Sequence, residues 1–216
     1  WNTLKVPKTI RPHKNLWIQI VSSDASLNQA GDHVGEIEDN PANRLYEHAV
    51  REWPKVHDKV TTWHWATGGG YEWPNLFSHC ANIRFWHACG IHGAQEQTAS
   101  GVGNSNWSEL KFWVWHRLKW DPGQDEDALI DRFLREYYGA KAAPYIRQYL
   151  ETSDRIRRNS GLYVPGGLVR WSAWSVNLRR KFLNMEALEE LAALLDKAHE
   201  AAEREDNPIY AKHLDE

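Results

Sequence analysis

The sequence predicts an α/β fold, in which a parallel sheet with crossover helices is followed by a region of helices. Two observations predict it. A strand pattern, a loop of small or polar residues and a helix pattern follow one another three times before Asp121, and beyond it nearly every segment has helical spacing. Such alternation is typical of parallel strands joined by helices. We therefore expect a βα region at residues 1–122 and a helical region at residues 123–216.

Three short runs of β-branched and aromatic residues are the expected strands, at residues 15–21, 59–65 and 91–98. A polar or glycine-rich loop follows each run. In the barrel version of this architecture, function gathers at the carboxyl ends of the strands. Three βα units cannot close a barrel, so either the sheet is open or further strands lie outside this chain.

Apolar residues at helical spacing predict the helices. In the βα region, helix-start signals at residues 40–41, 74–76 and 107–109 open expected helices at about residues 42–56, 74–90 and 107–120. In the helical region, the expected helices span residues 125–138, 142–159, 172–184 and 185–205.

Composition and charge exclude several classes of function. Hydrophobic residues make up 42% of the 216 residues and charged residues 25%, which are ordinary globular values. With 26 Lys and Arg against 29 Asp and Glu, the net charge of −3 gives no electrostatic basis for binding nucleic acid. No apolar run approaches the roughly 18 to 20 residues of a membrane span. Because the chain begins at Trp1 rather than Met, we expect it to be a piece of something longer.

Glu96 is the strongest catalytic candidate. It lies near the end of the third expected strand, between Gln95 and Gln97 and directly before a loop. A carboxylate in this uncharged setting is partly desolvated, which raises its pKa towards the range useful for acid–base work. Gln97 is a substrate-binding candidate beside it. The alternative is a glutamate held by hydrogen bonds to neighbouring loops.

Trp63, His64 and Trp65 end the second expected strand and are also binding candidates. Because side chains alternate along a strand, His64 faces opposite to both indoles. If His64 faces the ligand, the indoles pack under the helices. If the indoles face the ligand, His64 lies in the layer between sheet and helices. A histidine hydrogen-bonded among core aromatics is an equally good interpretation.

The chain has 13 tryptophans, an excess that suits stacking on the flat apolar faces of sugars. Trp73 and Trp107 are the expected stacking rings, together with Tyr71. We expect Asp24 either to bind a sugar hydroxyl or to cap a turn. We expect Asn75 to cap a helix or to face the ligand. The tryptophans within expected helices are assigned to the core: Trp86, Trp113, Trp115 and Trp120.

Neither a metal nor an organic cofactor is expected. The chain has 11 histidines, but no H-E-x-x-H, C-x-x-C or phosphate-binding glycine motif occurs. Ligand-like spacing is also absent among five of the histidines: His57, His64, His79, His87 and His92. Cys80 and Cys89 fall within one expected helix, about 13 Å apart along its axis, which is too far for a disulfide. We expect two buried thiols.

Three stretches resemble the family catalogued as domain of unknown function 4838. They are residues 63–65 with 73–76, residues 93–97, and the Trp-Asp-Pro element at 120–122 that leads to Tyr-Tyr-Gly at 137–139. The resemblance covers about residues 7–150. Members of this family resemble (β/α)8-barrel glycoside hydrolases akin to α-glucuronidases and hexosaminidases. The resemblance implies that residues 1–122 are the C-terminal portion of a TIM-type barrel, with about three parallel βα units.

By the same resemblance, Glu96 corresponds to a carboxylate that helps to activate water at the end of a late strand. The family commonly has an Asp in the preceding strand, where this chain has His64. A second acid, and the N-terminal half of the barrel as a partner, would come from sequence upstream of this chain. The resemblance favours a periplasmic or extracellular location.

The sequence supports two main functions, and a carbohydrate ligand is the expected partner in both. We expect neither a nucleic-acid partner nor a membrane span. The first is hydrolysis of glycosidic bonds in a polysaccharide or oligosaccharide, with Glu96 as the acid/base carboxylate. The second is a non-catalytic carbohydrate-binding barrel module, in which indoles hold the glycan and His64 replaces a carboxylate. A third interpretation assigns all the aromatic rings to the core, and it predicts that Trp73 and Trp107 are fully buried.

Overall fold

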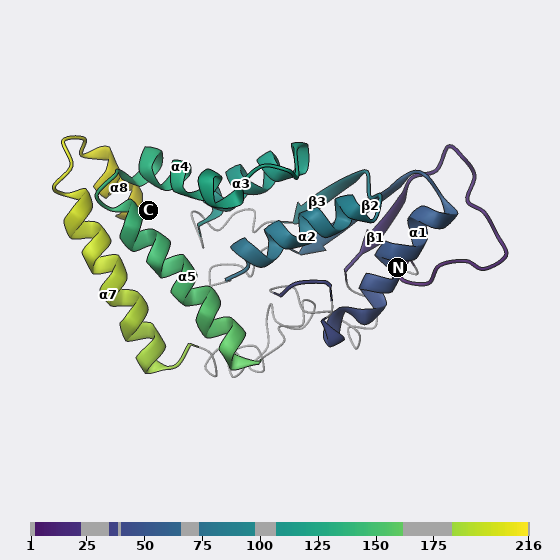
Figure 1. Cartoon of the computed structure of the whole chain (residues 1–216), viewed down its shortest axis with the longest axis horizontal. Coiled ribbons are helices and arrows are strands. Elements are labelled where there is room, and N and C mark those ends of the chain that lie inside the picture. The colour runs from purple at the N-terminus through teal and green to yellow at the C-terminus, as the bar shows by residue number, and fades with distance from the viewer. Residues whose placement is uncertain are drawn as a thin grey trace.

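The structure is a computed structural model that describes residues 3–22, 35–38, 40–65, 74–97, 107–161 and 183–215 (Figure 1). In this part of the chain, three strands form one parallel sheet in the order β1 (Ile18–Val21), β2 (Val60–Trp65) and β3 (Gly93–Gln97). The predicted α/β fold with a parallel sheet is confirmed. Each strand is shorter than its sequence pattern by one to three residues at the start.

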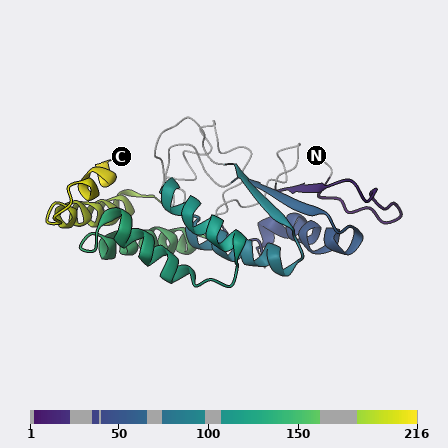
Figure 2. The ribbon, with the colours of Figure 1, turned by 90° about the horizontal axis from the view of Figure 1, so that it is seen from above.

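The two faces of the sheet differ in exposure. Ile20 and Val60 are fully buried on the face that the helices cover. Figure 2 shows helices α1 (Arg44–Val56) and α2 (Leu76–Ala88) on one side of the strands. On the opposite face, polar side chains such as Thr61 and Gln95 alternate with these apolar residues and are partly or fully exposed. This period of two is what a strand with one buried face requires.

Local capping signals set the helix starts. A 3-10 turn, Pro41–Asn43, precedes α1, and the Asn40 side chain accepts a hydrogen bond from the Ala42 amide at 3.0 Å. Asp125 caps α4 (Glu126–Tyr138) in the same way, since its carboxylate accepts from Asp127 and Ala128 at 3.0 and 3.2 Å. Short polar side chains stabilise helix starts because the first amides have no partner within the helix.

The helical region continues with α5 (Ala143–Ser160), α7 (Met185–Ala202) and α8 (Ile209–Asp215). Helices α5 and α7 pack side by side in Figure 1. The helices expected at residues 125–138, 142–159 and 185–205 are present within one to three residues of their predicted ends. The helix expected at residues 172–184 lies mainly outside the described residues. Helix α8 was not predicted.

The core runs without a break from the sheet into the helical region. Buried residues of the sheet and of α2 form one cluster with α3 (Ser108–Trp120), α4, α5 and α7. Arg84 of α2 also holds the turn between α3 and α4, because it donates to the carbonyls of Pro122 and Gln124 and pairs with Glu126. The two regions therefore pack as one unit in the described chain.

Two expectations about burial need correction. Trp86 and Trp115 are core residues as predicted, but Trp120 is 92% exposed because it is the last residue of α3 and points away from the core. Cys80 is buried, whereas Cys89 is only half-buried, because it follows the end of α2. Neither forms a disulfide, in agreement with their spacing.

Gly139 closes α4 with a φ of +91°, which side chains rarely adopt. A Cβ atom there would lie 2.8 Å from Tyr210 Cδ2 and 2.9 Å from Glu205 Oε1. We expect Gly139→Ala to lower the free energy of unfolding by about 2–4 kcal/mol, since it adds a clash to the strain. Urea unfolding measures this change.

Gly161 provides the matched control. It also has a positive φ, +59°, but a Cβ atom there would meet nothing within 4 Å. Gly161→Ala should therefore lower the free energy of unfolding only by the backbone strain, which is about 1 kcal/mol. Equal losses for the two variants would contradict the close approach of α8 to Gly139.

Candidate functional site

The strand ends meet in parallel register, as the sequence predicts. His64 of β2 pairs with Glu96 of β3, and Trp63 pairs with Gln95. His64 and Glu96 contact residues of α2 and α3, so they lie in the layer between sheet and helices. Because side chains alternate, Trp63 and Gln95 lie on the opposite face. Of the two arrangements that the sequence allowed for Trp63 and His64, the structure has the one with His64 under the helices.

Glu96 is the centre of a buried polar cluster that we call the Glu96 cluster (Glu96, His79, Lys119 and His64). The Glu96 side chain is 4% exposed and that of His79 is 1% exposed. His79 Nε2 donates to Glu96 Oε1 at 3.2 Å, and the Lys119 ammonium bonds the other carboxylate oxygen. These contacts join β3 to both α2 and α3.

Aromatic rings enclose the cluster. The His79 ring lies 4.2 Å from Trp115 and 5.3 Å from Trp86, between ring centroids. The His64 ring lies 5.0 Å from His79 and 5.7 Å from Trp86. Such packing keeps water away from His79 and from one side of Glu96, so every charge in the cluster has to be compensated within it.

The charge state of the cluster follows from burial and partners. Burial lowers the pKa of His79 by more than Glu96 raises it, so His79 is neutral at pH 7 and carries its hydrogen on Nε2. Burial alone would raise the pKa of Glu96, but the hydrogen bond from His79 and the charge of Lys119 outweigh it and hold the pKa below its ordinary value. Glu96 is therefore an ionised carboxylate paired with Lys119.

The other face of the sheet carries a second polar group, which we call the amide face (Gln19, Thr61, Trp63 and Gln95). Gln19 Nε2 donates to Gln95 Oε1 at 3.3 Å, which links β1 to β3 across the intervening strand. Trp63 lies beside this bridge, because its register partner is Gln95. Primary amides both donate and accept hydrogen bonds, so this face can bind hydroxyl groups.

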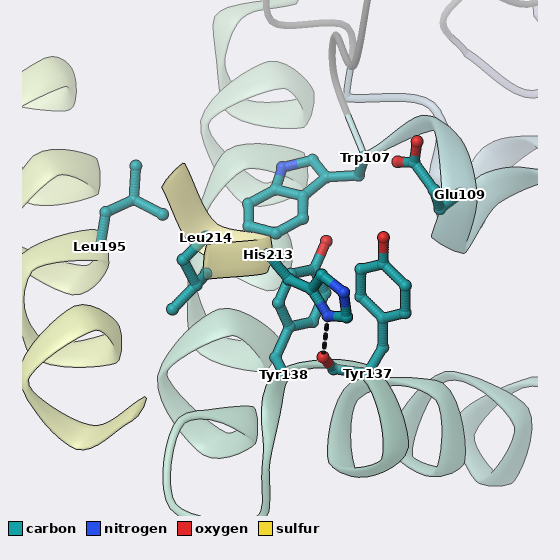
Figure 3. Close-up of a pocket in the computed structure, with 7 residues that line it drawn as sticks. All are labelled: Trp107, Glu109, Tyr137, Tyr138, Leu195, His213 and Leu214. Carbon is teal, nitrogen blue, oxygen red and sulfur yellow. Dashed lines mark hydrogen bonds between the residues drawn. The ribbon is translucent and has the colours of Figure 1, made fainter. Parts of the chain in front are cut away.

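Trp107 lines a pocket of about 160 Å³ between the ends of α3 and α4 and helices α7 and α8 (Figure 3). It is the residue before α3, half-buried, with a left-handed backbone at φ 59°. The pocket combines aromatic and aliphatic walls with a carboxylate and an imidazole, and its lining residues are Trp107, Glu109, Tyr137, Tyr138, Leu195, His213 and Leu214.

The remaining predicted site residues are placed less fully. Asp24 and Trp73 lie outside the described residues. Trp65 and Gln97 lie in β2 and β3, where the structure describes only their backbone. Asn75 precedes α2 and is 1% exposed, and its side chain does not cap the helix.

Sequence reasoning did not find four of the residues that define these groups. His79 and Lys119 are each one of several polar residues in their helices, and only the fold brings them to Glu96. Gln19 and Gln95 each alternate with residues of the buried face of the sheet. This period of two was the sequence signal that could have placed both glutamines on the opposite face.

Within the described ranges, no three His, Cys, Asp or Glu side chains gather closely enough to hold a metal ion. Among the helices described there, none combines the length and the apolar character that crossing a bilayer requires.

We expect the free energy of unfolding to decrease as the pH falls below about 6.5. Unfolded His79 takes up a proton near that pH, whereas folded His79 stays neutral to a lower pH because its pKa is lowered. Protons therefore favour the unfolded state, with a slope of up to about 1.4 kcal/mol per pH unit. The lowered pKa of Glu96 extends the loss below about pH 4.3. Urea unfolding at a series of pH values measures the slope.

A His79→Gln variant should flatten this slope between about pH 6.5 and 5, even if its overall stability is lower. His48→Gln is the matched control, because His48 is exposed on α1 and its replacement should leave the slope unchanged. An unchanged slope in His79→Gln would show that His79 does not titrate differently on folding.

Neither a curated protein nor a solved structure matches the chain. One family match covers residues 1–151, which include the sheet, the Glu96 cluster, Trp107 and helices α1 to α4. Its description is "Domain of unknown function (DUF4838)". Since this match spans well over half of the 216 residues, the chain belongs to the DUF4838 family.

Proposed function

We propose that this chain binds carbohydrate on the amide face of its sheet. The observation that carries the proposal is the Gln19–Gln95 bridge beside Trp63, on the face of the sheet opposite to the helices. Amides can exchange hydrogen bonds with sugar hydroxyls, and an indole can pack against the apolar face of a sugar ring. This combination matches a hydroxylated ligand better than an ionic or a purely apolar one.

The polarity of the sheet supports a ligand on this face. Parallel sheets are usually covered on both faces and are correspondingly apolar. Here Gln19, Thr61 and Gln95 keep one face polar, although β1, β2 and β3 are all parallel. A polar face on a parallel sheet suits the lining of a ligand cleft.

The resemblance of residues 63–65, 73–76 and 93–97 to the DUF4838 family adds to the proposal, since members of that family resemble barrel glycoside hydrolases. In a (β/α)8 barrel, further parallel strands would extend the outer edges of β1 and β3, and the amide face would line the interior. The carboxyl ends of the strands would then form the mouth of the ligand site. This barrel is part of the proposal.

Hydrolysis of a glycosidic bond, with Glu96 as the acid/base carboxylate, is the second candidate. The observation that favours it is the position of Glu96 near the carboxyl end of β3, which is where barrel enzymes carry their catalytic groups. The lowered pKa of Glu96 does not favour the acid role, because it keeps the carboxylate ionised. The geometry of Glu96 favours hydrolysis less than carbohydrate binding. The Glu96 side chain is only 4% exposed and is bonded to His79 and Lys119 under the helices.

Replacing the indole of the amide face should weaken binding. We expect Trp63→Ala to reduce the affinity for a bound polysaccharide at least tenfold, since a stacking indole contributes about 1–3 kcal/mol. A glycan array identifies the ligand, and calorimetry with the full chain measures the affinity. Trp120→Ala is the matched control, because Trp120 is an exposed indole at the far end of α3. Equal effects of the two variants would count against the amide face.

Glu96→Gln separates the two candidates. The amide keeps the shape but leaves Lys119 without its counter-charge, so we expect about 1–3 kcal/mol less stability in either case. If Glu96 is the acid/base group, turnover of a bound polysaccharide also falls by about 10²–10⁴. Binding with no turnover by the unaltered chain, or turnover that Glu96→Gln leaves intact, would exclude Glu96 catalysis. Reducing-end release measures turnover, and urea unfolding measures stability.

A further inference from the structure

The geometry points to a second ligand site, in which the Trp107 pocket holds one neutral sugar ring. This site shares a ligand class with the proposed function but none of its residues. Its walls come from the ends of α3 and α4 and from α7 and α8 (Figure 3). Three lining residues, Leu195, His213 and Leu214, lie beyond the stretch that matches the family.

The size of the pocket limits the ligand. Its volume of about 160 Å³ is well below the roughly 300–1,000 Å³ typical of sites for drug-sized ligands. A single six-membered ring with its substituents is the largest unit that fits. The Trp107 indole on one side and Leu195 on another give the apolar surface that the C–H face of such a ring requires (Figure 3).

Two polar groups of the pocket, His213 and Glu109, favour a ligand that donates hydrogen bonds. His213 Nδ1 lies 2.7 Å from the Tyr137 carbonyl, which can only accept, so Nδ1 carries the hydrogen. In the tautomer with its hydrogen on Nδ1, Nε2 is an acceptor. Glu109 adds a carboxylate, of which Oε2 accepts from Ser108 at 3.2 Å. Hydroxyl groups satisfy such acceptors, whereas the carboxylate of an acidic sugar would be repelled by Glu109.

The backbone of Trp107 is strained, and packing of its side chain keeps it in this conformation. A left-handed backbone is strained for an aromatic residue, and such strain persists only where the surroundings fix it. Here the indole packs edge-on against Tyr138, at 5.7 Å between ring centroids, and lies 5.3 Å from Tyr149. Strained residues cluster at ligand sites, and this one forms a wall of the pocket.

The opposite wall is equally well fixed. The His213 ring stacks on Tyr137 at 3.9 Å with an interplanar angle of 11°. Glu205, in the turn before α8, accepts from the Lys141 amide at 2.6 Å and so ties that turn to the end of α4. A rigid pocket binds with a smaller entropy cost, which matters most for a ligand as small as one sugar.

An aromatic cage for a quaternary ammonium ion fits the pocket less well. Such cages need several open ring faces around the cation. Tyr137 is already stacked with His213 and with Phe133, the latter at 5.0 Å, and Tyr138 is in edge contact with Trp107. This leaves too few open faces for a cage.

The test uses the full chain and saturation-transfer NMR with D-glucose, D-galactose, D-mannose and D-xylose as neutral probes. D-glucuronate and tetramethylammonium serve as the acidic and the cationic probe. We expect at least one neutral sugar to bind and both charged probes to give no signal. Glu109→Gln should weaken that binding at least tenfold, because it replaces a charged acceptor. Glu200→Gln, at an exposed position of α7, is the matched control and should leave binding unchanged.

A pocket-filling variant, Leu195→Trp, should abolish the signal without removing a polar contact. Circular dichroism would confirm that each variant is folded. The proposal is overturned if no neutral sugar binds, if Glu109→Gln binds like the unaltered chain, or if tetramethylammonium binds instead. Loss of the signal in Trp63→Ala but not in Glu109→Gln would assign the sugar to the amide face, which would overturn this site and keep the proposed function.

Discussion

The ionised carboxylate of Glu96 is the contact on which the arrangement of sheet and helices depends. Its two oxygens bond side chains from two different helices, His79 on α2 and Lys119 on α3. An ionised group in a nearly dry layer is tolerated only with such partners, because an uncompensated charge there costs several kcal/mol. The carboxylate therefore favours the one placement of α2 and α3 against β3 that satisfies it, in addition to the apolar packing around it.

This placement decides what each strand end can do. Once Glu96 faces the helices, its register partner His64 faces them too, and Trp63 and Gln95 turn to the other side. The binding candidates at the ends of β2 and β3 thus lie in two environments, with His64 and Glu96 together in one of them. One environment holds a neutral histidine and an ion pair in an aromatic shell, and the other offers amides and an indole.

The sequence predicted the order of strands and helices up to α7, because these elements carry local signals. Asp125 before α4 and the alternation in β2 are signals of this kind. Which side of a strand meets the helices depends on the pairing of distant segments, so the orientation of His64 and Glu96 could not be read from residues 59–65 and 91–98 alone. The same holds for Trp120, whose helix was predicted but whose exposure depends on what packs at the end of α3.

The family match and the folded unit do not end at the same residue. Residue 151 lies inside α5, and this helix packs along α7 at residues 185–202. A protein cut at the boundary of the matched stretch would lose half of α5 and the whole of α7, the helix along which α5 packs. The stretch that matches the family therefore ends within a packed pair of helices rather than between two separate units.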